Sequence, residues 1–216
     1  MAVLKLPLLA LLLLPLWAHA APPWTEQGEA QALAATLSEG ARYQRYWRTT
    51  WASLYATSAV ANSVRAERTS NRDSRYDGRV TAVKSILGFA DVLLSPPSHH
   101  RRWQQLDMGT TGEIDLHAAR DTLAALEIEE QQRHGWQARV SPLLVNAAAG
   151  LLIGVEDNRP RDGWINAATG MLVTELRIRT EPRHATRHTL RLGEYAFSYS
   201  AHWWLLPDQI GVQLYF

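Results

Sequence analysis

The sequence predicts an α+β fold, in which four to five helices form antiparallel hairpins and a C-terminal antiparallel β-meander of three to four strands follows. Between residues 41 and 175 apolar residues recur every three or four positions, as on one face of a helix. After residue 175 they recur at every second position, as in a strand. Because the helices precede the strands without alternating with them, separate helical and sheet layers are expected rather than βαβ units.

The chain is expected to divide into four parts with different roles. These are a cleaved signal peptide at 1–20, a linker and short helix at 21–40, a helical region at 41–175 and a β-meander at 176–216.

The first 20 residues have the organisation of an export signal. Lys5 precedes an apolar run from residue 6 to 17, and Ala18 and Ala20 then flank one histidine in an A-x-A pattern. The run is about 12 residues, whereas a membrane-spanning helix needs about 20. We therefore expect cleavage before residue 21 and a protein exported to the periplasm or the cell envelope, including the outer membrane.

Composition excludes several classes of protein. The chain has no cysteine, so it has no disulfide, no catalytic thiol and no thiolate metal ligand. Its 22 basic and 21 acidic residues nearly balance, whereas an electrostatic nucleic-acid binder shows a basic excess. There is no Walker A loop, no dinucleotide-binding glycine fingerprint and no G-x-S-x-G motif. No cofactor and no nucleic-acid partner are expected.

Aromatic residues mark the first long helix, which is expected to start after Gly40 and to end near Arg68. Four aromatic side chains fall at successive i+4 positions on one face, namely Tyr43, Trp47, Trp51 and Tyr55. A stripe of this kind faces the core of a helical protein, and the alternative is an exposed binding surface. After the charged link SNRDSRYDG a second helix is expected, with apolar positions from Tyr76 to Leu94 and an end at Pro96, and a third is expected from near Asp115 to about residue 139.

A stretch rich in Gly and Ala at 142–175 is predicted to form a close-packed helical hairpin. Its small and polar residues recur every three or four positions, at Asn146, Gly150 and Gly154 in one arm and at Gly163, Gly170 and Thr174 in the other. Small residues at this spacing let two helix backbones approach closely. The apolar arms are about 14 and about 10 residues long, short of a membrane span, so a soluble or interfacial pair is expected.

The residues after Thr174 are predicted as strands. Leu176 and Ile178 alternate with arginines, and longer alternating runs follow at 195–205 and 210–216. The ending IGVQLYF resembles the terminal strand of bacterial outer-membrane β-barrel proteins, which close on a C-terminal Phe. The resemblance covers Ile210, Val212, Leu214 and Phe216. A barrel needs at least about eight strands, so it implies an oligomeric barrel here, and a soluble meander explains the same residues.

Four polar residues are candidates for chemistry. His184 and His188 are four residues apart, as two metal ligands on one helical turn would be, but the zinc-protease Glu is absent after His184. Glu175 interrupts an apolar arm, and Asp157 lies in the charged turn EDNRPRDG. If buried, Glu175 is either catalytic or, like Asn146, a hydrogen-bonded structural group. For Asp157 the alternative to a site is a surface turn whose acidic and basic residues neutralise one another.

These observations favour an exported envelope protein that is a non-enzymatic structural or interaction protein. The alternatives are a membrane-associated protein and a metal-dependent or hydrolytic periplasmic enzyme that uses Glu175, Asp157 or the two histidines. A protein partner, a membrane surface and a second copy of the chain remain open as partners.

Overall fold

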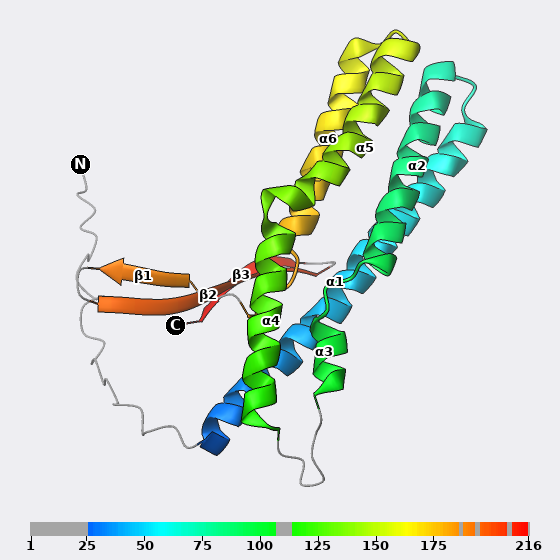
Figure 1. Ribbon diagram of the computed structural model, residues 1–216. Helices are drawn as coiled ribbons and strands as arrows, with labels where there is room; N and C mark the ends of the chain where they lie inside the picture. The colour runs from blue at the N-terminus through cyan, green and yellow to red at the C-terminus, as the bar shows by residue number, and fades with distance from the viewer. Residues whose placement is uncertain (1–25, 107–113, 186–187, 193–194, 207–208, 216) are drawn as a thin grey trace, which may run out of the picture.

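The computed structural model describes residues 26–106 and 114–185, and beyond them the backbone of 188–192, 195–206 and 209–215 (Figure 1). The signal peptide predicted at 1–20 lies outside the described residues, as do Phe216 and the side chain of His188. The export signal and the resemblance of the C-terminal strand therefore stay predictions.

The fold is all-α. Helices make up 87% of residues 26–106 and 114–185, and this part of the chain contains no β-strand. The prediction of an α+β fold ending in a β-meander is therefore wrong.

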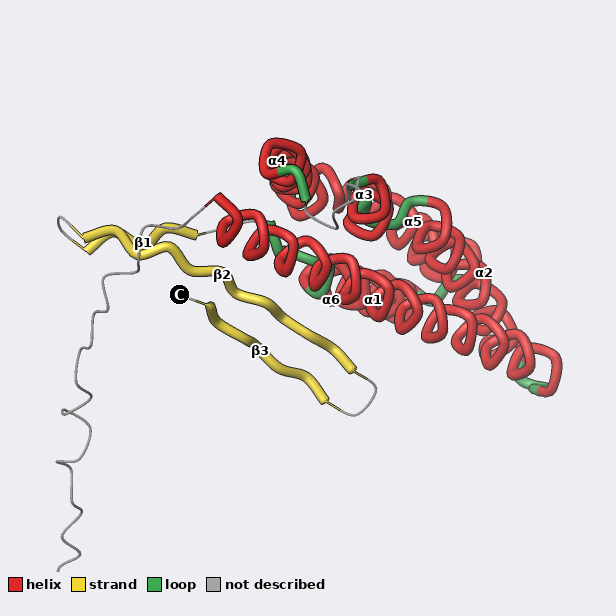
Figure 2. The backbone as a smooth tube through the Cα atoms, turned by 90° about the horizontal axis from the view of Figure 1, so that it is seen from below, coloured by secondary structure: helices red, strands yellow, loops and turns green. Residues whose placement is uncertain are grey.

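The backbone after residue 187 runs as three extended segments, β1 (His188–Leu192), β2 (Tyr195–Leu206) and β3 (Gln209–Tyr215). They pair antiparallel in the order β1-β2-β3 beside the helices (Figures 1 and 2). The side chains of these three segments lie outside the described part of the chain.

The helices form two antiparallel hairpins and a smaller body, visible in Figure 1. One hairpin consists of α1 (Glu26–Arg68) and α2 (Arg72–Leu94). The other consists of α5 (Val140–Leu151), the π-helical turn η2 (Leu152–Glu156) and α6 (Pro160–Arg179). Between them come α3 (His99–Gln105), α4 (Leu116–His134) and the short 3-10 turn η1 (Trp136–Arg139). Helices α3 and α4 pack against α1.

Local sequence explains most of the helix ends. The Asn71 side chain caps α2 by accepting a hydrogen bond from the backbone N–H of Ser74 at 2.8 Å. Asp115 caps α4 in the same way, accepting from the N–H of His117 at 2.9 Å. Pro160 occupies the first turn of α6, where its missing N–H costs no hydrogen bond.

Two predicted boundaries are wrong because tertiary contacts override the local signal. Helix α1 continues through Gly40, where an added Cβ would lie 3.1 Å from His99 and 3.2 Å from His184. This glycine allows a close approach to the helix rather than ending it. The strand predicted from Leu176 is the last turn of α6, in which Ile178 is buried and Arg179 pairs with Glu175 one turn earlier.

The end of the molecule that contains α3, α4 and the first half of α1 has an ordinary apolar core. Leu33, Leu37, Leu106, Ala119, Leu126 and Ala185 form one buried cluster. A second cluster joins α1 to α2 through Trp47, Trp51 and Val92. Both indoles are 4% exposed, and their Nε1–H groups donate to the Thr180 hydroxyl at 3.2 and 3.0 Å. The aromatic stripe therefore holds the end of α6 against α1.

Candidate functional site

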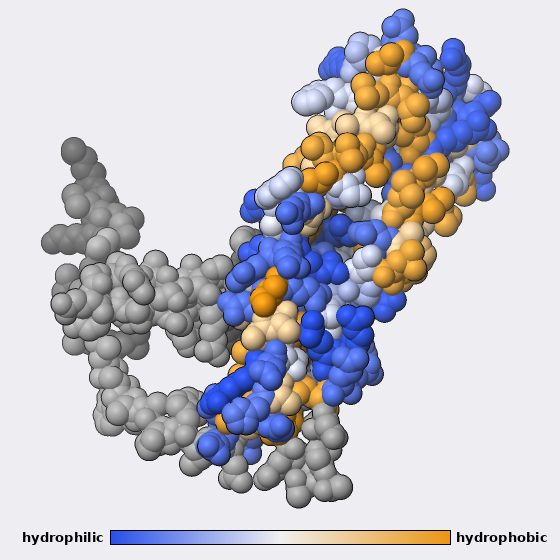
Figure 3. Space-filling view, in the orientation of Figure 1, coloured by the Kyte–Doolittle hydropathy of each residue, from blue (hydrophilic) through white to orange (hydrophobic). Residues whose placement is uncertain are grey.

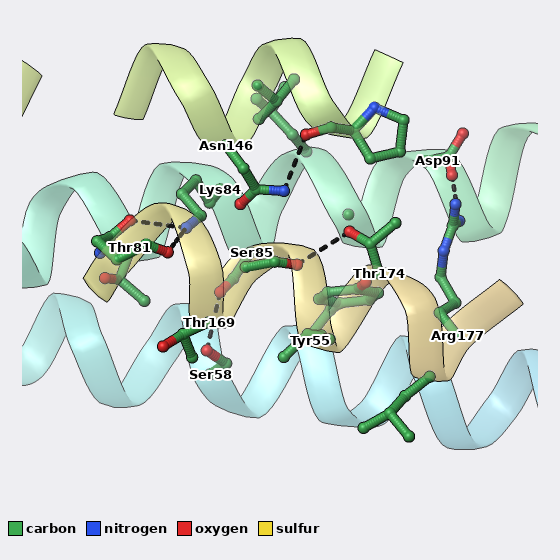
Figure 4. Close-up of a pocket in the computed structure, with 18 of the residues that line it drawn as sticks. Tyr55, Ser58, Thr81, Lys84, Ser85, Asp91, Asn146, Thr169, Thr174 and Arg177 are labelled. Atoms are coloured by element: carbon green, nitrogen blue, oxygen red, sulfur yellow. Dashed lines mark hydrogen bonds and ion pairs between the residues drawn. The ribbon is translucent and has the colours of Figure 1, made fainter. Parts of the chain in front are cut away.

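A cleft of about 1040 Å³ lies between the two hairpins (Figure 4). Its walls come from α1, α2, η1, α5, η2 and α6. We call the end near the turns 69–71 and 157–159 the tip, and the end near Trp51, Asp91 and Leu176 the base.

Small residues pack each hairpin tightly within itself. In the α5–α6 hairpin, a Cβ on Gly150 would lie 2.8 Å from the Gly163 carbonyl oxygen, and a Cβ on Gly163 would meet the backbone of Gly150 and Gly154. In the α1–α2 hairpin, a Cβ on Gly78 would lie 2.9 Å from the Asn62 carbonyl oxygen. The helices of each pair are therefore at contact distance along these faces.

The two hairpins, in contrast, are joined mainly by polar side chains. At the tip, Arg159 pairs with Asp77, and Arg72 pairs with Asp157 at 3.2 Å. At the base, Arg177 of α6 pairs with Asp91 of α2. These bridges hold the hairpins at both ends and leave the space between them open.

Lys84 makes the one bridge in the middle of the cleft among the described contacts. Its Nζ donates from α2 to the Asn166 side-chain oxygen at 2.7 Å and to the Asn166 carbonyl oxygen at 3.2 Å (Figure 4). Both acceptors are uncharged amides. The other charged residues that line the cleft, Asp77, Asp91, Asp162 and Arg177, are all in ion pairs. In the described part of the chain, Lys84 is thus the lining charge without an ionic partner.

The lining changes character along the cleft. From Lys84 toward the tip polar side chains predominate, with Asp77, Thr81, Asp162 and Asn166 beside Ile153 and Ile165, and Thr169 lies one turn beyond Asn166 toward the base. From Lys84 toward the base large apolar side chains are the more numerous, with Trp51, Leu54, Tyr55, Leu87, Pro142, Val145, Val173 and Leu176, beside the polar Ser85, Gln137, Ser141 and Thr174 and the Asp91–Arg177 ion pair. The cleft is therefore amphipathic along its length.

The outer surface of the hairpins is unusually apolar. Large side chains such as Leu94 of α2, Leu144 of α5 and Leu172 of α6 are 83%, 65% and 67% exposed. Figure 3 shows apolar residues gathered over this part of the molecule. Most of the residues buried in these helices beyond Trp51 are small or polar: Ala66, Gly78, Ala82, Ser85, Asn146, Ala149, Gly163 and Thr174, beside Val92, Ile153 and Ile178.

The carboxylates singled out from the sequence lie outside the cleft lining, in ion pairs. Glu175 receives two hydrogen bonds from Arg139, at 2.8 and 3.0 Å, and one from Arg179 at 2.8 Å. Asp157 is held between Arg72 and Arg159 at the tip. Each carboxylate is engaged by two guanidinium groups, which suits a structural link better than a general base.

The structure places the other predicted packing residues along α5 and α6. The Asn146 side chain is 5% exposed and donates to the Pro142 carbonyl oxygen at 2.8 Å, while its Oδ1 lies against Gly170. At Gly154 an added Cβ would make only ordinary contact, 3.4 Å from Pro160.

A second buried polar cluster lies at the opposite end of the molecule. His99 Nε2 is 2.8 Å from Glu130 Oε1, which also accepts the N–H of Ala185 at 2.9 Å. His184 packs against the ring of Tyr43, with ring centroids 5.4 Å apart. Within residues 26–106 and 114–185, no group of three or more His, Asp or Glu is arranged to hold a metal ion. The cluster fixes residues 181–185 against α3 and α4.

Burial shifts the pKa of two groups near this cluster in opposite directions, and in both cases it disfavours the charged form. It raises the pKa of Glu181, which is 5% exposed, to about 7, although Arg133 lies 3.7 Å away. It lowers the pKa of His134 to about 4.

Sequence reasoning missed Lys84 and α3. One signal for Lys84 was available, because it is the only lysine after residue 5 and interrupts the apolar stretch VTAVKSILGFA of α2. Its position on the inner face of the hairpin depends on the helix pairing. Comparisons with family models, with curated proteins and with solved structures found no match to this chain.

Proposed function

We propose that this chain is a membrane-embedded envelope protein, in which the α1–α2 and α5–α6 hairpins enter the bilayer and the α3–α4 end stays in water. The observation that carries the proposal is the inverted polarity of the hairpins. Large apolar side chains are exposed while small and polar ones are buried. Helices surrounded by lipid pack through small and polar residues in this way, whereas helices in water bury their large apolar side chains.

Helix length and hydropathy support this placement. Residues 72–105 and 136–156 are long and apolar enough to cross a membrane, with mean hydropathy 1.2 and 1.6 over their most apolar windows. Core helices of water-soluble proteins pass the same test, but they are mostly buried, and here only 22% and 17% of those windows are buried.

Charge placement supports it as well. Residues 49–64 of α1 and 140–155 of α5 to η2 contain no charged residue, and each stretch is about 24 Å long as a helix. The hydrocarbon layer of a bilayer is about 30 Å thick, and long arginine side chains at the ends of a span reach the interface. Lys84, which lies at this level, faces the cleft rather than the outer surface, as charged residues in membranes do. The export signal expected at residues 1–20 agrees with an envelope membrane.

The absence of cysteine makes a site-specific test simple, because every introduced thiol is unique. Leu172→Cys places a thiol on the exposed face of α6, and Gln131→Cys places one on the exposed face of α4. The test uses washed membrane fragments, in which both faces of the bilayer are accessible to the reagent. We expect a membrane-impermeant maleimide to label Gln131→Cys and to leave Leu172→Cys unlabelled until detergent is added.

Fractionation gives the second readout. The wild-type chain should stay in the membrane pellet after washes with high salt and with alkaline carbonate. Leu172→Arg should leave the pellet, while the control Ile128→Arg, at an exposed apolar position of α4, should not. Recovery of the wild-type chain in the soluble fraction, together with equal labelling of both cysteine variants, would show that the exposed apolar faces meet water or another protein instead.

A further inference from the structure

The middle of the cleft presents a cation that the described residues do not neutralise. Lys84 has three N–H donors, and the two acceptors that the structure gives it belong to Asn166. The third N–H makes no hydrogen bond among the described contacts, and the nearby Asn146 Oδ1, which lies beside the same Gly170 as Lys84 Nζ, also has no hydrogen-bond donor. Thr81, one turn before Lys84, and Thr169, one turn after Asn166, add hydroxyl groups to the lining in this part of the cleft (Figure 4).

The apolar half of the cleft continues from this point toward the base. Between Lys84 and Asp91 it extends for about 10 Å along α2, beside Tyr55, Leu87 and Val173. A volume of about 1040 Å³ is at the upper end of the usual range for pockets that hold small molecules. The site thus combines one positive charge, nearby hydroxyl groups and an apolar half that is about 10 Å long.

We propose that the cleft binds a single-chain fatty acid, with the carboxylate at Lys84 and the alkyl chain along the apolar half toward Trp51 and Leu176. Charge complementarity selects the head group, because a carboxylate would supply the ionic partner that the half-buried Lys84 lacks among the described residues. The apolar lining selects an alkyl tail over a small polar anion. The inference rests on the proposed function only in that the surrounding membrane is the source of the fatty acid.

Decanoate is the probe, since its chain suits the length of the apolar half. The full chain is reconstituted in phosphatidylcholine nanodiscs, and radiolabelled decanoate is titrated against it, with empty nanodiscs subtracted. Lys84→Gln removes the charge, and Lys84→Arg keeps it. Arg79→Gln is the matched control, because it removes a positive charge from the same helix at a residue outside the lining.

The wild-type protein should bind decanoate saturably, and Lys84→Gln should weaken binding by about tenfold or more, as expected for loss of a charge-assisted contact. Arg79→Gln should change the affinity by less than about twofold, because exposed charges contribute little. Lys84→Arg should retain most of the affinity. Thr169→Trp, which fills the cleft from α6, should abolish binding, and decanol should compete much more weakly than decanoate.

Three results would overturn the inference: no saturable binding above empty nanodiscs, equal affinity of the wild type and Lys84→Gln, or equal competition by decanol and decanoate. If Lys84→Gln loses its helical circular dichroism, the decanol comparison and Thr169→Trp decide the question. The two proposals can fail separately. A chain found in the soluble fraction that still binds decanoate through Lys84 overturns the membrane placement alone, whereas a membrane-resident chain without decanoate binding overturns the ligand alone.

Discussion

Gly163→Ala tests the close contact of α5 with α6. A Cβ at residue 163 would meet the Gly150 carbonyl oxygen and would lie 2.7 and 2.8 Å from the N and Cα atoms of Gly154. All three are backbone atoms of the opposite helical segment, so relief requires the two segments to move apart. Overpacking of this kind costs about 1–3 kcal/mol, and the better helix propensity of Ala offsets at most about 1 kcal/mol.

Three backbone contacts below 3 Å place this cost at about 2–3 kcal/mol, so with about 1 kcal/mol offset the expected net loss is about 1–2 kcal/mol, or a decrease in Tm of about 2–8 °C for a chain of this size. Thermal unfolding followed by circular dichroism, in one detergent for all variants, measures it. Gly154→Ala is the matched control, because its Cβ would make only ordinary contact, 3.4 Å from Pro160. It should melt at or above the wild-type temperature. An unchanged Tm for Gly163→Ala would refute the close contact.

Three further substitutions test the polar links around the cleft and the loop after α6. Glu181→Gln removes a buried carboxyl whose pKa is raised from 4.5 to about 7. In the wild type the contribution of the neutral carboxyl to the free energy of unfolding is fully present below pH 4.5. It is lost as the pH rises to 7 and above, and the loss is about 3 kcal/mol. Urea unfolding of both proteins at pH 4 and pH 8 should show the variant gaining relative stability with pH, and a constant difference would contradict the burial argument. Arg159→Met removes the ion pairs with Asp77, Asp157 and Asp162 and should lower the free energy of unfolding by about 2 kcal/mol. The distance between spin labels at Arg75→Cys and Arg161→Cys should then increase. An unchanged distance would show that these ion pairs do not hold the two hairpins together at the tip. Thr180→Val leaves two buried indole N–H groups without their hydroxyl acceptor and should cost about 2 kcal/mol, whereas Thr169→Val, at an exposed position of α6, should be neutral in thermal unfolding.

His134 also contributes to the pH dependence of stability below pH 6.5. Burial lowers the pKa of His134 from 6.5 to about 4, so the protein loses stability as the pH falls through this window. Glu181 acts in the opposite direction over nearly the same range. Because both proteins contain His134, its effect cancels in the difference between Glu181→Gln and the wild type, which is why the prediction is made on the difference.

Helical periodicity predicted most of the helices, and local signals predicted some of their ends. Asp115 and the prolines after α2 act locally and were predicted from the sequence, whereas the cap at Asn71 was not. Gly40 has the same local signature as a helix end, yet it is buried beside His99 and His184, which are 59 and 144 residues further along the chain. The strand predicted at Leu176 and Ile178 depended on two apolar residues, too few to establish a period, and in α6 they lie on different faces, with Leu176 exposed and Ile178 buried.

The candidate site was less accessible to sequence analysis than the hairpins that form it. The spacing of Gly150, Gly163 and Gly170 predicts close contact within one hairpin, because those residues lie on neighbouring segments. The cleft depends on contacts between hairpins, such as Lys84 with Asn166 and Arg177 with Asp91, which join residues more than 80 positions apart. With one sequence, no local pattern reports such pairs.

The hydropathy of a single arm of the 142–175 stretch predicts a soluble or interfacial pair, whereas the membrane placement proposed above depends on the paired helices. The uncharged stretches of α1, α5 and η2 lie beside α2 and α6 in the folded chain. What distinguishes a lipid-facing helix is which side chains are exposed once the helices have paired, and the pairing buries Ser85, Asn146 and Thr174 while Leu94, Leu144 and Leu172 face outward. Helix α1 makes the same point within one element: its first half buries Leu33 and Leu37, and its second half exposes Val60 and Val64. A helix that crosses from water into lipid would bury its large apolar side chains in the first half and expose them in the second, and α1 has this arrangement.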